Sequence, residues 1–179
     1  SESFYRGDGE KSGYLADALK GKTDSEFKHT VVLGNILPSF INSIGGNIDF
    51  VILDTTHVLP GEILDFITVY PYLTKDACIV LHDIANNHYG NYLSAYCTQL
   101  LLDSVVAESI IIYDDSRPYK YPNIGAFIIN EDTKKYIRNI FHSLMLTWDY
   151  IPNEIVLKKY CLSWEQHYNS HYIELFHTS

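Results

Sequence analysis

Short apolar runs alternate with longer amphipathic stretches along most of this chain. Runs of about five apolar residues are typical of strands buried between helices, whereas apolar residues spaced three and four apart predict helices. The order strand, helix, strand, helix, strand predicts one doubly wound α/β domain over residues 1–179, with a mostly parallel sheet. Predicted strands are 29–33, 49–53, 77–81, 109–113 and 125–129, the last two as an antiparallel pair, and predicted helices are 10–20, 36–44, 60–72, 89–106, 131–149 and 153–175.

Composition and charge narrow the classes of function. The 179 residues are 46% hydrophobic and 20% charged, a balance typical of a chain that folds around a core. A formal net charge of −9, with no basic cluster to offset it, repels phosphate backbones, so we expect no nucleic-acid partner. The apolar runs are too short to span a bilayer and no signal peptide is visible, so we expect no membrane association.

The cysteines point to a reducing compartment. Cys78, Cys97 and Cys161 are far apart in the sequence and form no Cys-x-x-Cys pair, so neither a disulfide framework nor a structural zinc site is expected. We interpret all three as small buried hydrophobic residues. Together with the absence of a signal peptide, this predicts a cytoplasmic protein.

Titratable residues directly follow two of the predicted strands. Asp54 comes after strand 49–53 with His57 three residues later, and His82 and Asp83 come at the end of strand 77–81. Ligands of open parallel sheets bind outside the carboxyl ends of strands, and neighbouring strands are about 4.8 Å apart. We therefore expect one metal ion or one substrate hydroxyl to reach Asp54 and Asp83 together. The alternative, that both aspartates only cap the following helices, leaves the adjacent histidines unexplained.

These residue types suit two kinds of chemistry. Carboxylates favour Mg²⁺ or Ca²⁺, and imidazoles shift the preference toward Mn²⁺, Fe²⁺ or Zn²⁺. His57, on the loop beyond Asp54, also suits a general base. Two further acids, Glu62 and Asp65, are interpreted as residues near a helix N-terminus that complement the helix dipole.

Two stretches together resemble a known enzyme family. The segment 48–66 contains Leu53-Asp54-Thr55-Thr56-His57, and the segment 77–84 contains His82-Asp83. They resemble class I S-adenosylmethionine-dependent methyltransferases, and most closely their small-molecule O-methyltransferase branch. That branch carries an Ile-Asp-Gly-Asp-His-like element at the fourth strand and a His-Asp or Glu-Asp pair at the fifth, so Thr-Thr here replaces Gly-Asp. Residues 29–38 similarly resemble the third strand and its turn, and residues 124–127 resemble a late strand.

The resemblance implies a Rossmann-like fold, S-adenosylmethionine as methyl donor, and Mg²⁺ or another divalent metal. The acceptor it implies is a small hydroxylated molecule such as a sugar or natural product. Asp54, His82 and Asp83 would be the metal ligands, and His57 would deprotonate the acceptor hydroxyl next to the methyl donor. The cofactor-binding residues that it implies are Gly34, Asn35 and Asp54.

Part of the family pattern has no counterpart. The strand with a Gly-rich turn and the strand ending in an acid for the ribose are expected upstream of residue 10 and are absent there. We therefore expect either a fragment of a longer polypeptide or a chain without the methionine-and-ribose half of the cofactor site. The open sheet edge that this leaves predicts a homodimer. Two other functions stay open: a non-catalytic methyltransferase-like module that binds a partner or belongs to a larger biosynthetic enzyme, and, less consistent with the strand order, a metal-dependent hydrolase.

Overall fold

The computed structural model describes residues 30, 32, 34–88, 93–111, 113 and 122–177. The chain divides into two compact units, Ser1–Ile36 and Leu37–Ser179, and the helices and strands given below belong to the second. The predicted helix 10–20 lies outside the described residues. So do positions 29, 31 and 33 of the predicted strand 29–33, whose positions 30 and 32 have no regular structure.

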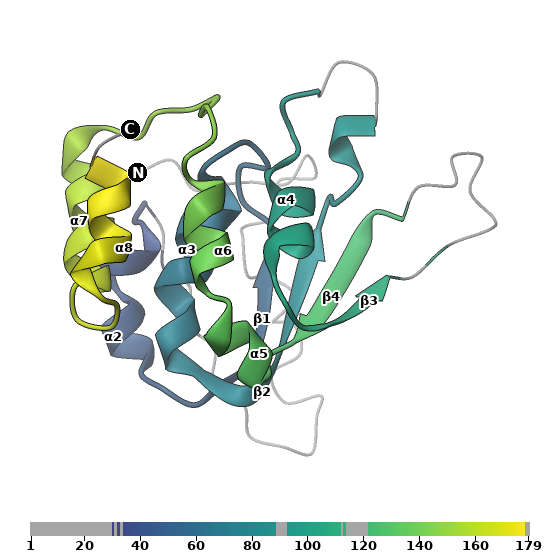
Figure 1. Cartoon of the computed structure of the whole chain (residues 1–179), viewed down its shortest axis with the longest axis horizontal. Coiled ribbons are helices and arrows are strands. Elements are labelled where there is room, and N and C mark those ends of the chain that lie inside the picture. Colours follow the sequence, from purple (N-terminus) through teal and green to yellow (C-terminus); the bar gives the residue numbers. More distant parts are fainter. Residues whose placement is uncertain are drawn as a thin grey trace. The chain divides into compact units, whose positions relative to one another are not determined.

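The second unit contains a four-stranded sheet in the order β1-β2-β4-β3 (Figure 1). β1 and β2 are parallel, whereas β4 is antiparallel to both β2 and β3. The mixed α/β class and the late antiparallel pair are confirmed, but the expectation of a mostly parallel sheet is wrong. Helix α3 crosses from β1 to β2 and so preserves the strand direction, whereas β4 returns beside β3 and inserts between β3 and β2. The strands are β1 (Ile48–Leu53), β2 (Leu73–His82), β3 (Glu108–Ile111) and β4 (Ile124–Ile128).

The helices begin largely where the sequence predicts, but several are shorter or divided. The side chains of Asn130 and Asn153 cap two of them by accepting hydrogen bonds from backbone N–H groups. Within the predicted helix 89–106, the described residues 93–96 are not helical and α4 begins at Cys97, whose N–H donates to the carbonyl of His57. Predicted helices 36–44, 131–149 and 153–175 each divide into two elements. The helical elements are η1 (Leu37–Ser39), α2 (Ile41–Ile44), α3 (Gly61–Val69), η2 (Tyr70–Tyr72), η3 (Asn86–His88), α4 (Cys97–Ser104), α5 (Glu131–Lys135), α6 (Arg138–Ser143), α7 (Glu154–Trp164) and α8 (Ser170–His177).

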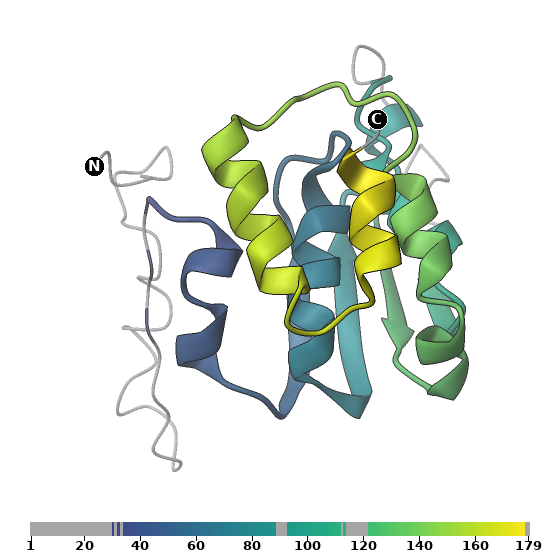
Figure 2. The ribbon, with the colours of Figure 1, turned by 60° about the vertical axis from the view of Figure 1, so that its left-hand side comes forward.

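The core lies between the sheet and helices α3 and α4. Phe127 of β4 and Phe66 of α3 are fully buried and pack edge to face, with ring centroids 5.5 Å apart. At Gly125 a Cβ atom would lie only 2.9 Å from the Leu102 side chain of α4, so glycine allows this helix to approach the strand closely. Helices α7 and α8 pack outside α3 and α6 (Figure 2). Within the described residues, no helix combines the length and apolarity that crossing a bilayer requires.

The opposite face of the sheet is open in the described part of the chain. Phe50 and Ile52 of β1 alternate with buried Leu53 and point to this face, where their exposed fractions are 54% and 60%. No helix of the described residues covers them, so this part of the chain does not show the helices on both faces that a doubly wound fold requires. Strand β1 also forms one edge of the sheet, and the homodimer expected from an open edge stays a prediction.

The carboxyl group of half-buried Asp65 joins α3 to α7. Tyr160 of α7 donates a hydrogen bond of 2.9 Å to Asp65 Oδ1 of α3. Burial raises the pKa of Asp65 from 3.8 to about 6, although the hydrogen bond from Tyr160 opposes the rise. Between these two pH values the folded state therefore binds more protons than the unfolded state.

Replacing Asp65 with asparagine is expected to change how stability depends on pH. Because its pKa is raised on folding, Asp65 lowers the free energy of unfolding as the pH rises from about 4 to about 6. Over this pH range the free energy of unfolding falls by at most about 3 kcal/mol because of Asp65. Urea unfolding at a series of pH values should therefore show Asp65→Asn gaining stability relative to the wild type across this window, while Asp103→Asn, an exposed control in α4, runs parallel to the wild type. Parallel curves for Asp65→Asn would contradict this prediction.

Candidate metal centre

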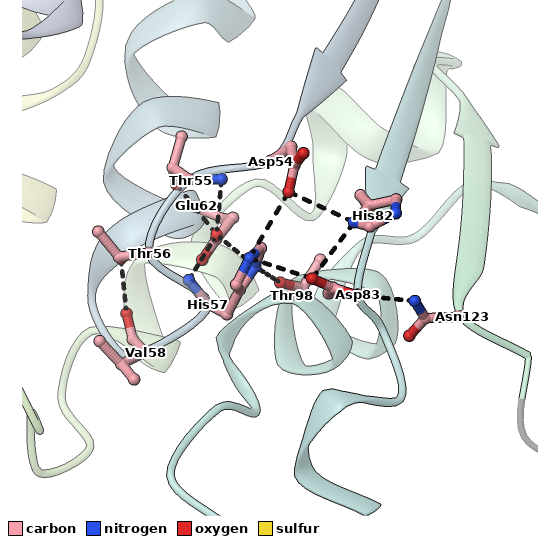
Figure 3. A network of polar contacts seen from close by, with 10 residues as sticks. All are labelled: Asp54, Thr55, Thr56, His57, Val58, Glu62, His82, Asp83, Thr98 and Asn123. Carbon is pink, nitrogen blue, oxygen red and sulfur yellow. Dashed lines mark hydrogen bonds and ion pairs between the residues drawn. The ribbon is translucent and has the colours of Figure 1, made fainter. Parts of the chain in front are cut away.

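The candidate site lies at the carboxyl ends of the two parallel strands. Leu53 of β1 is in register with Leu81 of β2, so the residues that follow these strands leave the sheet side by side. Asp54 and His57 come from the loop after β1, while His82 and Asp83 come from the end of β2 (Figure 3). The expectation that neighbouring strand ends bring these four side chains together is confirmed.

The four side chains form a closed cycle of contacts, called here the Asp/His ring (Asp54, His57, His82 and Asp83). Asp54 Oδ1 lies 3.5 Å from His57 Nε2 and 3.4 Å from His82 Nδ1. Asp83 Oδ2 lies 3.3 Å from each of the same two nitrogens. Each carboxylate oxygen thus faces two imidazole nitrogens, and each nitrogen faces two oxygens.

The Asp/His ring is open to solvent on one side. The side chain of Asp54 is 54% exposed and that of His82 is 43% exposed, whereas His57 and Asp83 are only 18% and 22% exposed. His82 Nδ1 is nevertheless a buried atom without a hydrogen-bond partner of suitable geometry. A buried polar atom in this position requires a partner. It faces the two carboxylates, which is where a cation would lie.

The donor atoms fit a divalent metal ion. Donor atoms of Asp54, His57 and Asp83 all lie within 4.8 Å of one another. Ligand atoms about 2.1 Å from one ion in a tetrahedral arrangement are roughly 3.4 Å apart. The four neighbouring contacts of the Asp/His ring, at 3.3–3.5 Å, are close to this distance, but the mutually close group comprises Asp54, His57 and Asp83 and does not include His82. Two imidazoles beside two carboxylates favour Mn²⁺, Fe²⁺ or Zn²⁺ over Mg²⁺.

Two of these residues have a left-handed backbone conformation. His57 and Asp83 both have φ of 60°. Aspartate and histidine adopt this region more often than most residues other than glycine, so the conformation alone does not mark a functional site.

Glu62 holds the loop that carries Asp54 and His57. Its Oε1 accepts hydrogen bonds from the backbone N–H of Thr55 (3.2 Å), the Thr55 hydroxyl (3.0 Å) and the backbone N–H of His57 (2.8 Å). Glu62 does lie in the first turn of α3, as the sequence predicts, but it is fully buried. Its interpretation as a residue that only complements the helix dipole is therefore incomplete. A single acid beside apolar Ile63 and Leu64 is the one signal in the sequence, and it is weak.

Asn123 holds the other aspartate. Its Nδ2 donates a hydrogen bond of 2.7 Å to Asp83 Oδ1, which leaves Oδ2 to face the imidazoles. The sequence offers no signal for this residue, because Asn123 and Asp83 come together only through the antiparallel pairing of β4 with β2.

The alternative that both aspartates only cap helices does not fit this geometry. The residue that precedes α3 is Pro60, and no side chain caps that helix. The Asp83 carboxylate bonds to Asn123 and faces two histidines instead. Both aspartates therefore belong to the Asp/His ring.

Comparisons of the chain with protein-family models, with curated proteins and with solved structures find no match. The methyltransferase resemblance accordingly stays a prediction. What can be inferred about function starts from the geometry of the Asp/His ring.

Two of the predicted cofactor-binding residues lie outside the unit that holds this site. Gly34 and Asn35 belong to Ser1–Ile36, where Asn35 Oδ1 accepts a hydrogen bond of 3.1 Å from the N–H of Ile36. Asp54, the third, is part of the Asp/His ring. The cofactor contacts of all three stay a prediction.

The cysteines do not contribute to the site. All three are free thiols, with Cys97 and Cys161 buried and Cys78 half-buried. Burial, with a smaller effect of nearby Glu62, raises the pKa of Cys97 far above its usual range. A thiol held in its protonated form is a poor metal ligand.

Proposed function

We propose that this chain binds a divalent transition-metal ion in the Asp/His ring and thereby activates the hydroxyl group of a small-molecule acceptor for methyl transfer. The observation that carries the metal step is the cycle of four contacts of 3.3–3.5 Å, one member of which, His82 Nδ1, is buried without a hydrogen-bond partner of suitable geometry. The methyl-transfer step rests on the family resemblance of the segments that contain these residues. The fold supports it only coarsely, through a mixed α/β sheet with one parallel pair.

The two aspartates and the two histidines would contribute different properties to the metal site. Asp54 and Asp83 supply negative charge, while His57 and His82 supply nitrogen donors. When bound, the ion would act as a Lewis acid that stabilises the alkoxide form of the acceptor. The exposed side of the Asp/His ring, next to Asp54, is where an acceptor can approach.

The family resemblance of the sequence predicts that His57 is a general base, but the geometry favours a different role. His57 Nε2 lies 3.3 Å from Asp83 Oδ2 and 3.5 Å from Asp54 Oδ1, as close to the carboxylates as His82 Nδ1 is. We therefore place His57 among the ligands, together with the Asp54, His82 and Asp83 set that the resemblance implies.

The described residues support a binding site for the methyl donor less well than they support the metal site. Strand β1 is an edge of the sheet, and in the described residues no strand beyond it carries a Gly-rich turn for the methionine or ribose. The described residues do not provide a binding surface for S-adenosylmethionine comparable to the donor atoms that they provide for a metal ion. We therefore derive no step through the donor and propose the metal-binding, acceptor-activating part of such an enzyme.

Metal titration of the wild-type chain tests this function. We expect Mn²⁺ or Zn²⁺ to bind more tightly than Mg²⁺ in calorimetric titrations. Asp83→Asn should weaken that binding at least about tenfold because it removes a negative charge from the Asp/His ring. The same exchange at exposed Asp103 should leave affinity unchanged. Wild-type protein that binds neither Mn²⁺ nor Zn²⁺, or Asp83→Asn protein that binds as tightly as wild type, contradicts the proposal.

Transfer of a labelled methyl group tests the second step. The chain would be incubated with Mn²⁺, labelled S-adenosylmethionine and a panel of sugars and hydroxylated natural products. Methylation that requires Asp83 supports the proposed reaction. Metal binding without any binding of S-adenosylmethionine would favour the alternative of a non-catalytic module.

A further inference from the structure

We propose that Glu62 is a positioning residue that holds the proton of the neutral His57 ring on Nδ1 and so leaves Nε2 free to accept a metal ion. This inference rests on the proposed metal-binding role of the Asp/His ring and extends it to a residue behind that ring. It goes beyond the part Glu62 plays in holding the loop after β1.

The first observation concerns the oxygen that faces the imidazole. Glu62 is fully buried, and its Oε1 already accepts from two backbone N–H groups and one hydroxyl. Three donors directed at one oxygen fix it as an acceptor and fix its position. His57 Nδ1 lies 3.3 Å from this same Oε1.

The second observation concerns the orientation of the imidazole. With Nδ1 toward Glu62, the other nitrogen, Nε2, points into the Asp/His ring between Asp54 and Asp83 (Figure 3). A neutral imidazole has one N–H and one lone pair, and the partner of one nitrogen decides the state of the other. An acceptor at Nδ1 therefore places the lone pair on Nε2. A carboxylate behind a metal-binding histidine acts in this way.

The Thr98 hydroxyl competes with Glu62 for this nitrogen. It lies 3.5 Å from Nδ1 in a hydrogen-bonding arrangement, whereas Glu62 Oε1 is closer, at 3.3 Å, but is in contact at ion-pair distance only. On the other side, the Asp54 and Asp83 side chains are 54% and 22% exposed, so water screens them more than it screens fully buried Glu62. In the metal-free protein we therefore expect the proton on Nδ1 despite the two aspartates at Nε2.

The experiment measures the tautomer directly. Long-range ¹H–¹⁵N spectra of the metal-free chain, recorded where the imidazole signals no longer change with pH, report which nitrogen of neutral His57 carries the proton. In wild type we expect the Nδ1–H form. In Glu62→Met, which removes the acceptor while keeping similar volume, we expect the Nε2–H form. Glu62→Gln keeps an acceptor oxygen and should restore Nδ1–H. An Nε2–H tautomer in the wild type overturns the inference even if Glu62→Met fails to fold.

Two control variants separate the effect of Glu62 on the His57 tautomer from a helix-dipole effect and from the effect of the Thr98 hydroxyl. Glu154→Gln makes the same exchange in the first turn of α7 and tests a helix-dipole effect, and Thr98→Val removes the competing hydroxyl. Both should retain the Nδ1–H form of His57. A switch to Nε2–H in Thr98→Val would assign the positioning role to Thr98 and overturn the inference for Glu62.

Zn²⁺ titration links the tautomer to metal binding. Glu62→Met should bind Zn²⁺ about 10- to 100-fold more weakly than wild type, and Glu62→Gln should recover most of that affinity. If wild type shows Nδ1–H and Glu62→Met shows Nε2–H, but wild type binds no metal, the proposed function fails while the positioning role of Glu62 stands. If metal binds equally well to wild type and Glu62→Met, and the tautomer is the same in both, the inference fails while the proposed function stands.

Discussion

The His57→Ala protein is expected to bind Mn²⁺ or Zn²⁺ at least about a hundredfold more weakly than wild type, a loss of about 2.7 kcal/mol. The alanine removes the nitrogen that lies 3.3 Å from Asp83 Oδ2 and 3.5 Å from Asp54 Oδ1. It also leaves two carboxylates facing each other without that donor between them. Calorimetric titration of each metal measures the effect, and circular dichroism checks that the variant is folded.

A control variant and a contradicting outcome accompany the His57→Ala prediction. His142→Ala removes an exposed imidazole at the end of α6 and should leave metal affinity unchanged. If His57→Ala binds metal as tightly as wild type but loses methyl transfer, His57 is a base, as its place in the sequence predicts, and its assignment as a ligand is wrong.

The Phe66→Ala protein is expected to be about 3–5 kcal/mol less stable than wild type. Phe66 is fully buried between the sheet and the outer helices, with its ring centroid 5.5 Å from that of Phe127 and 5.7 Å from that of Tyr70. Alanine would leave a cavity where α3 meets β4. Chemical unfolding of both proteins measures the difference in free energy of unfolding.

Phe50→Ala provides the matched control for that loss. Phe50 lies on the open face of the sheet and is 54% exposed, so its replacement should cost about 1 kcal/mol or less. A loss as large as that of Phe66→Ala would show that something covers this face in solution, and it would contradict the exposure described here.

Much of the candidate site could be predicted from the sequence. Polar residues that directly follow two apolar strands must meet if the strands are parallel neighbours, and Asp54, His57, His82 and Asp83 do meet. The residues that support them could not be predicted in the same way. Glu62 acts through a loop that folds back over the start of its helix, so its role depends on the conformation of that loop.

The sequence by itself determined the β1-α3-β2 unit and the placement of chemical groups at its strand ends. Both follow from local patterns: apolar runs of strand length, a proline at the start of a helix, and aspartates and histidines immediately beyond the strands. Only the tertiary structure decided that β4, of the two late strands, pairs with β2 and runs antiparallel to it, and with this the contact of Asn123 with Asp83. Strand direction depends on how a distant segment returns to the sheet, and an alternating pattern of apolar residues is the same in either direction.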